Sequence, residues 1–170
     1  GGKREVQQQV ATLAVSVAEA TFEDVLRQKL GELKRSYFEA LLAHHNVEIA
    51  IGNRDTAEQL VRLNATRFEG GAIAEGDLLK VRLERVRFDS AVRQAQLEEA
   101  QAMIRLLEKL EEPDLGIRPL AGSLETPLAT FNLASLKDMA LQKRPDLKAA
   151  SSQIALARER ISLEQSRAVP

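Results

Sequence analysis

Cysteine and tryptophan are absent from the 170-residue sequence, tyrosine occurs once and phenylalanine five times. Without cysteine there is no disulfide framework and no thiolate metal site. A compact globular domain of this length fills its core with more aromatic volume than this chain carries. Alanine, leucine and valine dominate the apolar residues instead, and they suit thin layers of helix packed on helix.

A surplus of charge and long apolar runs are also lacking. The sequence has 24 Lys and Arg against 25 Asp and Glu, a formal net charge of -1. We therefore expect no bulk electrostatic attraction to nucleic acid or to an anionic membrane. No segment approaches the roughly 20 apolar residues that a membrane-spanning helix needs, so we expect no transmembrane helix in this chain.

Proline is missing from a long first part of the chain, since all five prolines lie at or after Pro113. Apolar residues recur there every three or four positions, which predicts a helix from Arg4 to Phe68, roughly 95 Å long at about 1.5 Å per residue. The expected stripe consists of Val6, Val10, Leu13, Val17, Leu26, Leu30, Leu33, Tyr37, Leu41, Leu60 and Leu63, with Phe68 less regularly placed.

A glycine-rich stretch interrupts the helical pattern. Residues 69–76 read Glu-Gly-Gly-Ala-Ile-Ala-Glu-Gly, and glycines at this density end a helix and allow the chain to reverse. Asp77 follows, and a carboxylate at a helix start can accept backbone N–H bonds and favour the positive end of the helix dipole. We predict a second helix from about Asp77 to Glu111.

The second predicted helix carries two apolar stripes. One contains Val81, Phe88, Val92, Ala95, Met103, Leu106 and Leu110, and the other contains Leu79, Leu83, Val86, Leu97, Ile104 and Leu107. Two stripes indicate neighbours on two sides, as in a closed ring of helices. A simple two-helix hairpin would require only one.

Proline and glycine return after this helix. Residues 113–131 read as non-helical, Asn132 can cap a short helix over 133–143, and Pro145 suits the first turn of a helix that runs to about Arg167. The predicted fold is all-α, a long antiparallel coiled-coil hairpin plus a returning helix. Its expected parts are a hairpin over 1–112 with its tip at about 69–77, a Pro/Gly-rich equatorial segment over 113–132, and a short helix with the returning helix over 133–170.

No catalytic or metal-binding pattern stands out. His44 and His45 are adjacent and point about 100° apart on a helix, whereas a helical metal pair needs i,i+4 spacing. No Ser or Thr stands in a recognisable nucleophile arrangement, and the glycine-rich turn lacks the ending of a phosphate loop. We expect no enzyme activity, no metal and no cofactor.

Three stretches resemble segments of the TolC-like outer-membrane factor family. The turn from Arg67 to Leu79 resembles the family's helix-tip motif, which runs from Arg and an aromatic residue through Gly to Asp-Leu-Leu. The stretch 140–147, with Arg-Pro-Asp-Leu at its end, is similar to the family's "AL..RPDL" segment, and residues 1–4 resemble the "GGKR" of the heavy-metal efflux branch. The resemblance covers essentially the whole chain. The sequence departs from the family's tip motif at Ala74, where the family often has Ser or Thr, and in the extra glycines Gly70 and Gly76.

This resemblance implies that the chain is a fragment, the periplasmic helical (α-barrel) part of an outer-membrane efflux channel without its β-barrel. Such a channel passively conducts substrates exported by a tripartite pump. Three full-length copies would form the tunnel in the periplasm, attached to the outer membrane of a Gram-negative cell. The implied partners are the hairpin tips of a periplasmic adaptor (membrane fusion) protein and, indirectly, an inner-membrane transporter.

The resemblance also assigns adaptor contact and gating to the tip residues Arg67, Glu69, Gly70, Gly71, Ala72, Ile73, Ala74, Glu75, Gly76, Asp77 and Leu78. Residues 72–74 are expected to expose small apolar groups, and Arg67, Glu69, Glu75 and Asp77 to form a charged rim with ion pairs. The alternative is a structural or adaptor coiled coil, which the helical pattern suits equally but which leaves the Arg-Pro-Asp-Leu segment unexplained. A helical-bundle enzyme is a third alternative, but neither histidine has the Glu three residues before it that a di-metal bundle site uses.

Overall fold

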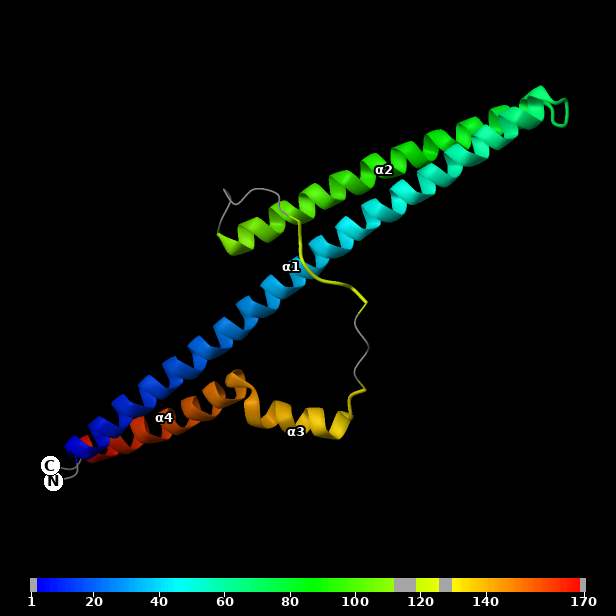
Figure 1. Cartoon of the computed structure of the whole chain (residues 1–170). Helices are drawn as coiled ribbons and strands as arrows, with labels where there is room; N and C mark the ends of the chain where they lie inside the picture. The colour runs from blue at the N-terminus through cyan, green and yellow to red at the C-terminus, as the bar shows by residue number, and fades with distance from the viewer. Residues whose placement is uncertain (1–2, 112–118, 126–129, 169–170) are drawn as a thin grey trace. The chain divides into compact units, whose positions relative to one another are not determined.

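The computed structural model describes residues 3–111, 119–125 and 130–168. These residues form four helices and no strand: α1 Lys3–Glu69, α2 Glu75–Leu110, α3 Leu133–Lys143 and α4 Pro145–Ala168 (Figure 1). The predicted all-α fold, with an antiparallel hairpin and a returning helix, is confirmed. Part of the predicted equatorial segment, residues 113–118 and 126–129, lies outside the described residues, as do Gly1, Gly2 and Pro170.

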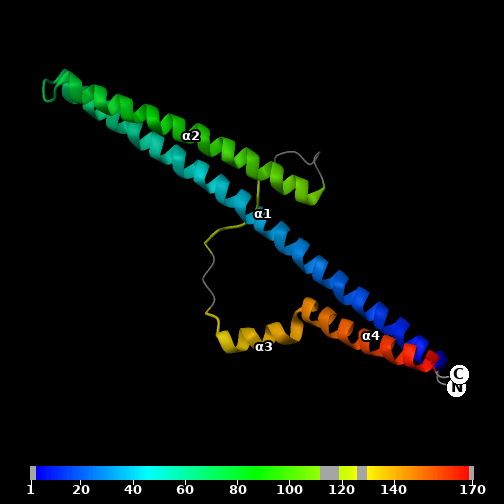
Figure 2. The same ribbon diagram turned by 180° about the vertical axis from the view of Figure 1, so that it is seen from behind.

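The chain divides into two units, and α1 contributes to both. One unit comprises residues 1–31 with 127–170, and the other comprises residues 32–126. In the second unit, α2 lies antiparallel beside residues 32–69 of α1, as Figures 1 and 2 show. We call this pair of helical segments the hairpin.

The core of the hairpin combines alanines with larger apolar side chains. Its buried members are Ala40, Ala102, Met103 and Leu106, and Leu33, Tyr37, Ala43, Leu107 and Leu120 pack against them. The distance between two packed helices depends on the side chains at their contact, so alanines there allow the backbones to approach closely. Further along the hairpin the buried residues include Val47 and Ala57 of α1 and Val92 and Ala95 of α2.

Near the tip, the packed side of α1 differs from the prediction. Leu60 and Leu63 are expected in the stripe, but they are 50% and 57% exposed. The buried residue at this level is Ala57, and Val61 is half-buried. The prediction is wrong for these two leucines because a small residue occupies the contact and the large side chains lie beside it.

The two predicted stripes of α2 have different surroundings. In the first stripe Val92, Ala95, Met103 and Leu106 are buried. In the second stripe Leu107 is half-buried, whereas the other five, Leu79, Leu83, Val86, Leu97 and Ile104, are 52–60% exposed. Helix α1 thus covers one side of α2, and most of the other apolar side is uncovered in the part of the chain that the structure describes.

In the other unit, α4 runs antiparallel to residues 3–31 of α1 (Figures 1 and 2). The buried residues here are Ala20 of α1 and Ala149, Leu156 and Leu163 of α4. Lys148 of α4 forms an ion pair with Glu23 of α1, with 3.5 Å between Nζ and Oε2. The predicted stripe residues Leu26 and Leu30 are about half exposed, so they are not part of this packed surface.

The start of α3 follows the sequence prediction. Asn132 has extended backbone, and its Oδ1 accepts hydrogen bonds from the N–H groups of Ala134 and Ser135 at 2.8 and 3.4 Å. These bonds satisfy two of the donors that the first turn of a helix leaves without partners. The predicted cap is confirmed, and the helix has the predicted bounds.

The junction of α3 and α4 depends on the Arg-Pro-Asp sequence. Arg144 has extended backbone, as expected before a proline, and Pro145 begins α4. The guanidinium group of Arg144 donates two hydrogen bonds to the carboxylate of Asp146, one of them 3.0 Å long. This contact lowers the pKa of Asp146 to about 2, with a smaller contribution from Arg27 of α1.

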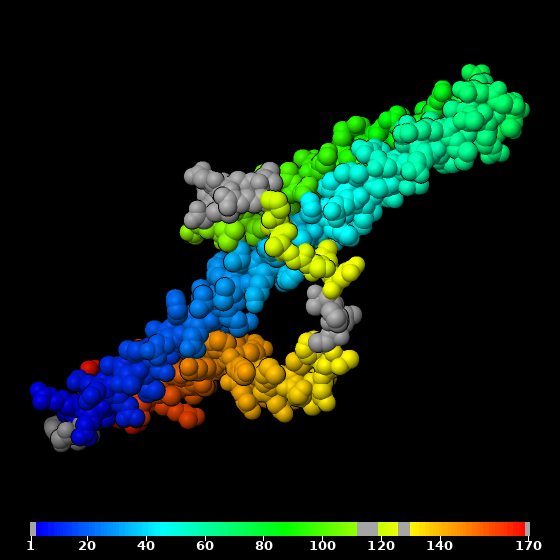
Figure 3. Space-filling model, viewed as in Figure 1, coloured from blue at the N-terminus to red at the C-terminus, as the bar shows by residue number. Residues whose placement is uncertain are grey.

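Residues 119–125 lie across α1 of the hairpin (Figure 3), and we call them the strap. The hydroxyl group of Tyr37 donates a hydrogen bond to the carbonyl oxygen of Ala121, although the two residues are 84 positions apart. Gly122 next to it has a φ of +125°, a backbone conformation that L side chains rarely adopt. A predicted non-helical stretch is thus packed against the hairpin through specific contacts.

Candidate functional site: the tip of the hairpin

Helix α1 ends at the tip in a glycine-dependent cap. The N–H of Ala72 donates to the carbonyl of Arg67 at 2.8 Å, and the N–H of Gly71 donates to that of Phe68 at 2.9 Å. Gly71 has a φ of +73°. This pair of bonds around a left-handed residue is the Schellman arrangement, which provides donors for the last carbonyl groups of a helix. The predicted role of the glycines as a helix end is confirmed here.

Helix α2 begins without a side-chain cap. Ala74 occupies the N-cap position with extended backbone, and its methyl group cannot accept a hydrogen bond. Asp77 lies within the first turn, where its N–H donates to the carbonyl of Ala74 at 3.0 Å. Its carboxylate pairs with Lys80, at 3.1 Å, and does not cap the backbone. The predicted capping role of Asp77 is wrong because the helix starts two residues earlier, although a negative charge in the first turn still suits the helix dipole.

Most of the predicted contact residues are exposed at the tip. They are Arg67, Glu69, Gly70, Gly71, Ala72, Ala74, Glu75, Gly76 and Asp77. Ile73 is half-buried, and Leu78 is only 3% exposed. The exposed small apolar groups are therefore those of Ala72 and Ala74. The side chain of Leu78 is buried, so in this conformation it does not belong to the exposed surface of the tip.

The charged rim contains little internal pairing. Asp77 pairs with Lys80. The structure records no ion pair for Arg67, Glu69 or Glu75 among the residues it describes. The expected ion pairs between rim residues are thus not formed within this chain, and these charges face solvent.

A shallow hollow of about 450 Å³ lies beside the tip. Besides Glu69, Glu75, Gly76 and Leu78 it is lined by Ala65, Phe68, Leu79 and Arg82, which were not among the predicted contact residues. Phe68 and Leu79 are exposed apolar side chains, and they belong to the same motif that runs from Arg67 to Leu79. That motif was the signal that could have identified them.

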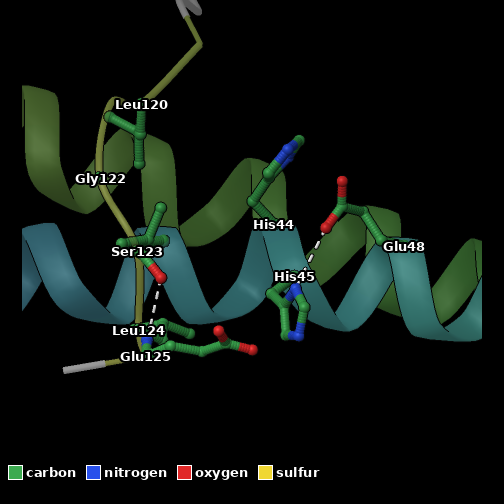
Figure 4. Close-up of a pocket in the computed structure, with 9 residues that line it drawn as sticks. His44, His45, Glu48, Leu120, Gly122, Ser123, Leu124 and Glu125 are labelled. Carbon is green, nitrogen blue, oxygen red and sulfur yellow. Dashed lines mark hydrogen bonds and ion pairs between the residues drawn. The ribbon is translucent and has the colours of Figure 1, made fainter. Parts of the chain in front are cut away.

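The two histidines lie away from the tip and point in different directions (Figure 4). Nδ1 of His44 lies 2.6 Å from Oε1 of Glu99 on α2, and Nδ1 of His45 lies 3.1 Å from Oε2 of Glu48 on its own helix. The hydrogen bond to Glu99 raises the pKa of His44 above its usual value of 6.5. Within the described residues no group of three or more His, Cys, Asp and Glu is arranged to hold a metal ion.

None of the helices within the described part of the chain combines the length and the apolarity that crossing a membrane requires. No protein-family model matches the sequence. No solved structure matches the chain either.

Two proteins of known sequence are similar to the chain. Protein CyaE of Bordetella pertussis is 28% identical over 178 aligned positions, which cover 99% of this chain and 36% of the relative. Alkaline protease secretion protein AprF of Pseudomonas aeruginosa is 31% identical over 160 positions, which cover 89% of this chain and 32% of the relative. The chain thus spans about a third of the length of the relatives it matches. Over most of its length, this helical chain is similar to one part of a protein that is named for the secretion of alkaline protease.

Proposed function

We propose that the chain forms part of the helical wall of a TolC-like duct in the envelope of a Gram-negative cell. In this proposal three copies of the protein surround a tunnel in the periplasm at the outer membrane. An inner-membrane transporter supplies the energy, and a periplasmic adaptor connects it to the duct. The chain conducts passively and has no catalytic role and no cofactor.

The observation that carries this proposal is the second apolar stripe of α2. At roughly 100° per residue, Leu83 and Leu97 lie on the side of the helix opposite to Val92 and Leu106. Helix α1 covers the Val92 side, and the Leu97 side is exposed. Exposed apolar patches of this kind mark interaction sites. A helix in a closed ring has a neighbour on each side, which fits such a distribution.

The comparisons support the same proposal. AprF is named for the secretion of alkaline protease, and its similarity to this chain extends over most of the chain. The heavy-metal branch is a finer proposal that rests on residues 1–4, of which Gly1 and Gly2 lie outside the described residues. The name of AprF favours an exported protein as cargo instead. A transport assay that offers a metal ion and a protein substrate separately distinguishes the two.

The alternative, an adaptor coiled coil, accounts for the α1–α2 hairpin. It gives no reason for the helices α3 and α4, or for the Arg144–Asp146 contact at their junction. The duct proposal includes these helices, because the returning helix completes the wall beside the first part of α1. We therefore favour the duct.

Contact between the tip and an adaptor can be tested by cysteine cross-linking in cells that express the protein with its adaptor. The chain has no cysteine of its own, so Ala72→Cys introduces a single thiol at an exposed position of the tip. Ala91→Cys is the matched control, since it replaces an exposed alanine of α2 away from the tip. We expect an adaptor adduct with Ala72→Cys and none with Ala91→Cys. Equal adduct formation at both positions, or none at any exposed tip position, contradicts the proposal.

A further inference from the structure

Among the described residues, ion pairs connect α1 with α2 in the hairpin, and one of these pairs contains a histidine. Glu58 pairs with Arg85 at 2.8 Å, and Glu32 pairs with Lys109 at 3.2 Å. The third joins His44 to Glu99 at 2.6 Å. Arginine and lysine stay charged at every physiological pH, whereas the charge of a histidine changes between about pH 5 and 8. Of these three contacts, the one at His44 is therefore the one that protons can control.

The groups that face His44 are predominantly acidic. Glu99 approaches it from α2, and Glu48 adds a negative charge from α1. His44 lines a hollow of about 280 Å³, and Glu125 of the strap lines it too, together with His45, which pairs with Glu48 (Figure 4). No Lys or Arg is among the described residues that line this hollow. Glu99 of α2 and Glu48 of α1 thus favour the imidazolium form of His44, and the partial burial of the ring opposes it.

We propose that His44 and Glu99 form a proton-controlled latch between α1 and α2, which tightens when His44 binds a proton. A neutral imidazole with its proton on Nδ1 can donate the hydrogen bond to Glu99. Protonation at Nε2 leaves this bond in place and adds a full positive charge, and charge-assisted hydrogen bonds are roughly twice as strong as neutral ones. The latch is a contact between two helices, so its opening separates the arms of the hairpin at this level.

The direction of the pH effect follows from the pKa of His44, which the hydrogen bond to Glu99 raises above its usual value of 6.5. The extra stability is fully present below about pH 6.5, where the histidine of the unfolded chain is also protonated. It is lost as the pH rises through the higher pKa of the folded state. Because His44 is half exposed, we expect an effect of about 1.5- to 5-fold on the opening equilibrium.

The latch is independent of the proposed duct, since it concerns two helices of this chain alone. Its test is a titration of His44 by NMR in the unaltered chain and in Glu99→Gln. The control is Glu98→Gln, which removes the adjacent acid of α2, an acid that accepts a hydrogen bond from Gln94. We expect the pKa of His44 to be higher than 6.5, to fall in Glu99→Gln, and to change much less in Glu98→Gln.

A double-mutant cycle with His44→Gln and Glu99→Gln gives a second readout. Urea unfolding at about pH 5.5 should show a coupling between the two positions that is weaker at about pH 8. If a variant does not fold, the titration of the unaltered chain still decides. A pKa of His44 at or below 6.5 overturns the proposal. So does an equal response to the two glutamate variants, or a coupling that is independent of pH.

Discussion

At the scale of single residues, the two helix ends that meet at the tip differ in how well they are capped. Gly71 gives α1 a cap with two backbone hydrogen bonds. Ala74 gives α2 no side-chain hydrogen bond, although its backbone already has the extended conformation of an N-cap residue. The weaker end of the tip is therefore the start of α2, and one hydroxyl group at Ala74 would supply the missing acceptor.

We predict that Ala74→Ser raises the free energy of unfolding by about 0.5–2 kcal/mol, the usual difference between serine and alanine at an N-cap. Urea denaturation of the chain measures it. Ala72→Ser is the matched control, because Ala72 is exposed and lies outside both helices. The control should change stability by less than about 0.5 kcal/mol. Equal effects of the two substitutions would show that the N-cap geometry is not responsible.

A second prediction at this scale concerns Asp146, whose pKa is lowered to about 2 by its contact with Arg144. The stability that this contact adds is present above about pH 4, where the carboxyl group is ionised in the folded and the unfolded chain. It is lost as the pH falls towards 2. Thermal melts should therefore show Asp146→Asn less stable than the unaltered chain above pH 4, with the difference vanishing on acidification.

The control for this titration is Asp138→Asn, which alters an exposed carboxylate of α3 that forms no ion pair with any described residue. It should show little or no such pH-dependent difference. A difference between Asp146→Asn and the unaltered chain that stays constant over this pH range would mean that the contact with Arg144 does not depend on the charge of Asp146.

At the scale of helices, the sequence predicts what depends on neighbouring residues. The uninterrupted length of α1 follows from the missing prolines and its end from the glycines at the tip, and the starts of α3 and α4 follow from Asn132 and Pro145. The packed side of α1 near the tip could not be predicted in the same way. Which residue fills the contact depends on how closely α2 approaches, and that is decided by pairs of residues far apart in sequence.

The strap illustrates the same limit. Proline and glycine predict that the strap is not helical. Its position on α1 depends on the hydrogen bond between Tyr37 and the carbonyl group of Ala121, 84 residues away. No periodicity in the sequence encodes such a pair. The hollow beside the tip is an intermediate case, because Phe68 and Leu79 lie in the recognised motif and only their exposure was unknown.

The small-residue contact leads to a prediction for the hairpin. Ala40 is 1% exposed and belongs to the core between α1 and α2. Ala40→Leu should lower the free energy of unfolding by about 1–3 kcal/mol, because the larger side chain forces the helices apart. Leu60→Ala removes a larger apolar group at a half-exposed position and should change it by less than about 0.5 kcal/mol. Urea denaturation of both variants measures this, and the opposite ranking would contradict the packing described here.

At the scale of the whole molecule, the chain presents more apolar helix surface than its own helices cover. The exposed stripe of α2 runs from Leu79 to Ile104. The chain is also similar to about a third of the length of CyaE and AprF. Both observations are explained if the uncovered stripe packs against another copy in an assembled duct wall.

The most direct test of this account is photo-cross-linking from the exposed stripe in cells. A photoreactive amino acid is placed at Leu97 in one variant and at the adjacent Glu98, an exposed polar position about 100° around the helix, in the other. If the stripe packs against another copy, position 97 gives an adduct between copies of the protein, recovered with the cell envelope, and position 98 gives little or none. Two outcomes would contradict the proposal that this stripe forms part of a duct wall. In one, the variant with the photoreactive residue at position 97 is recovered with the cell envelope but forms no adduct between copies. In the other, both variants form equal amounts of adduct.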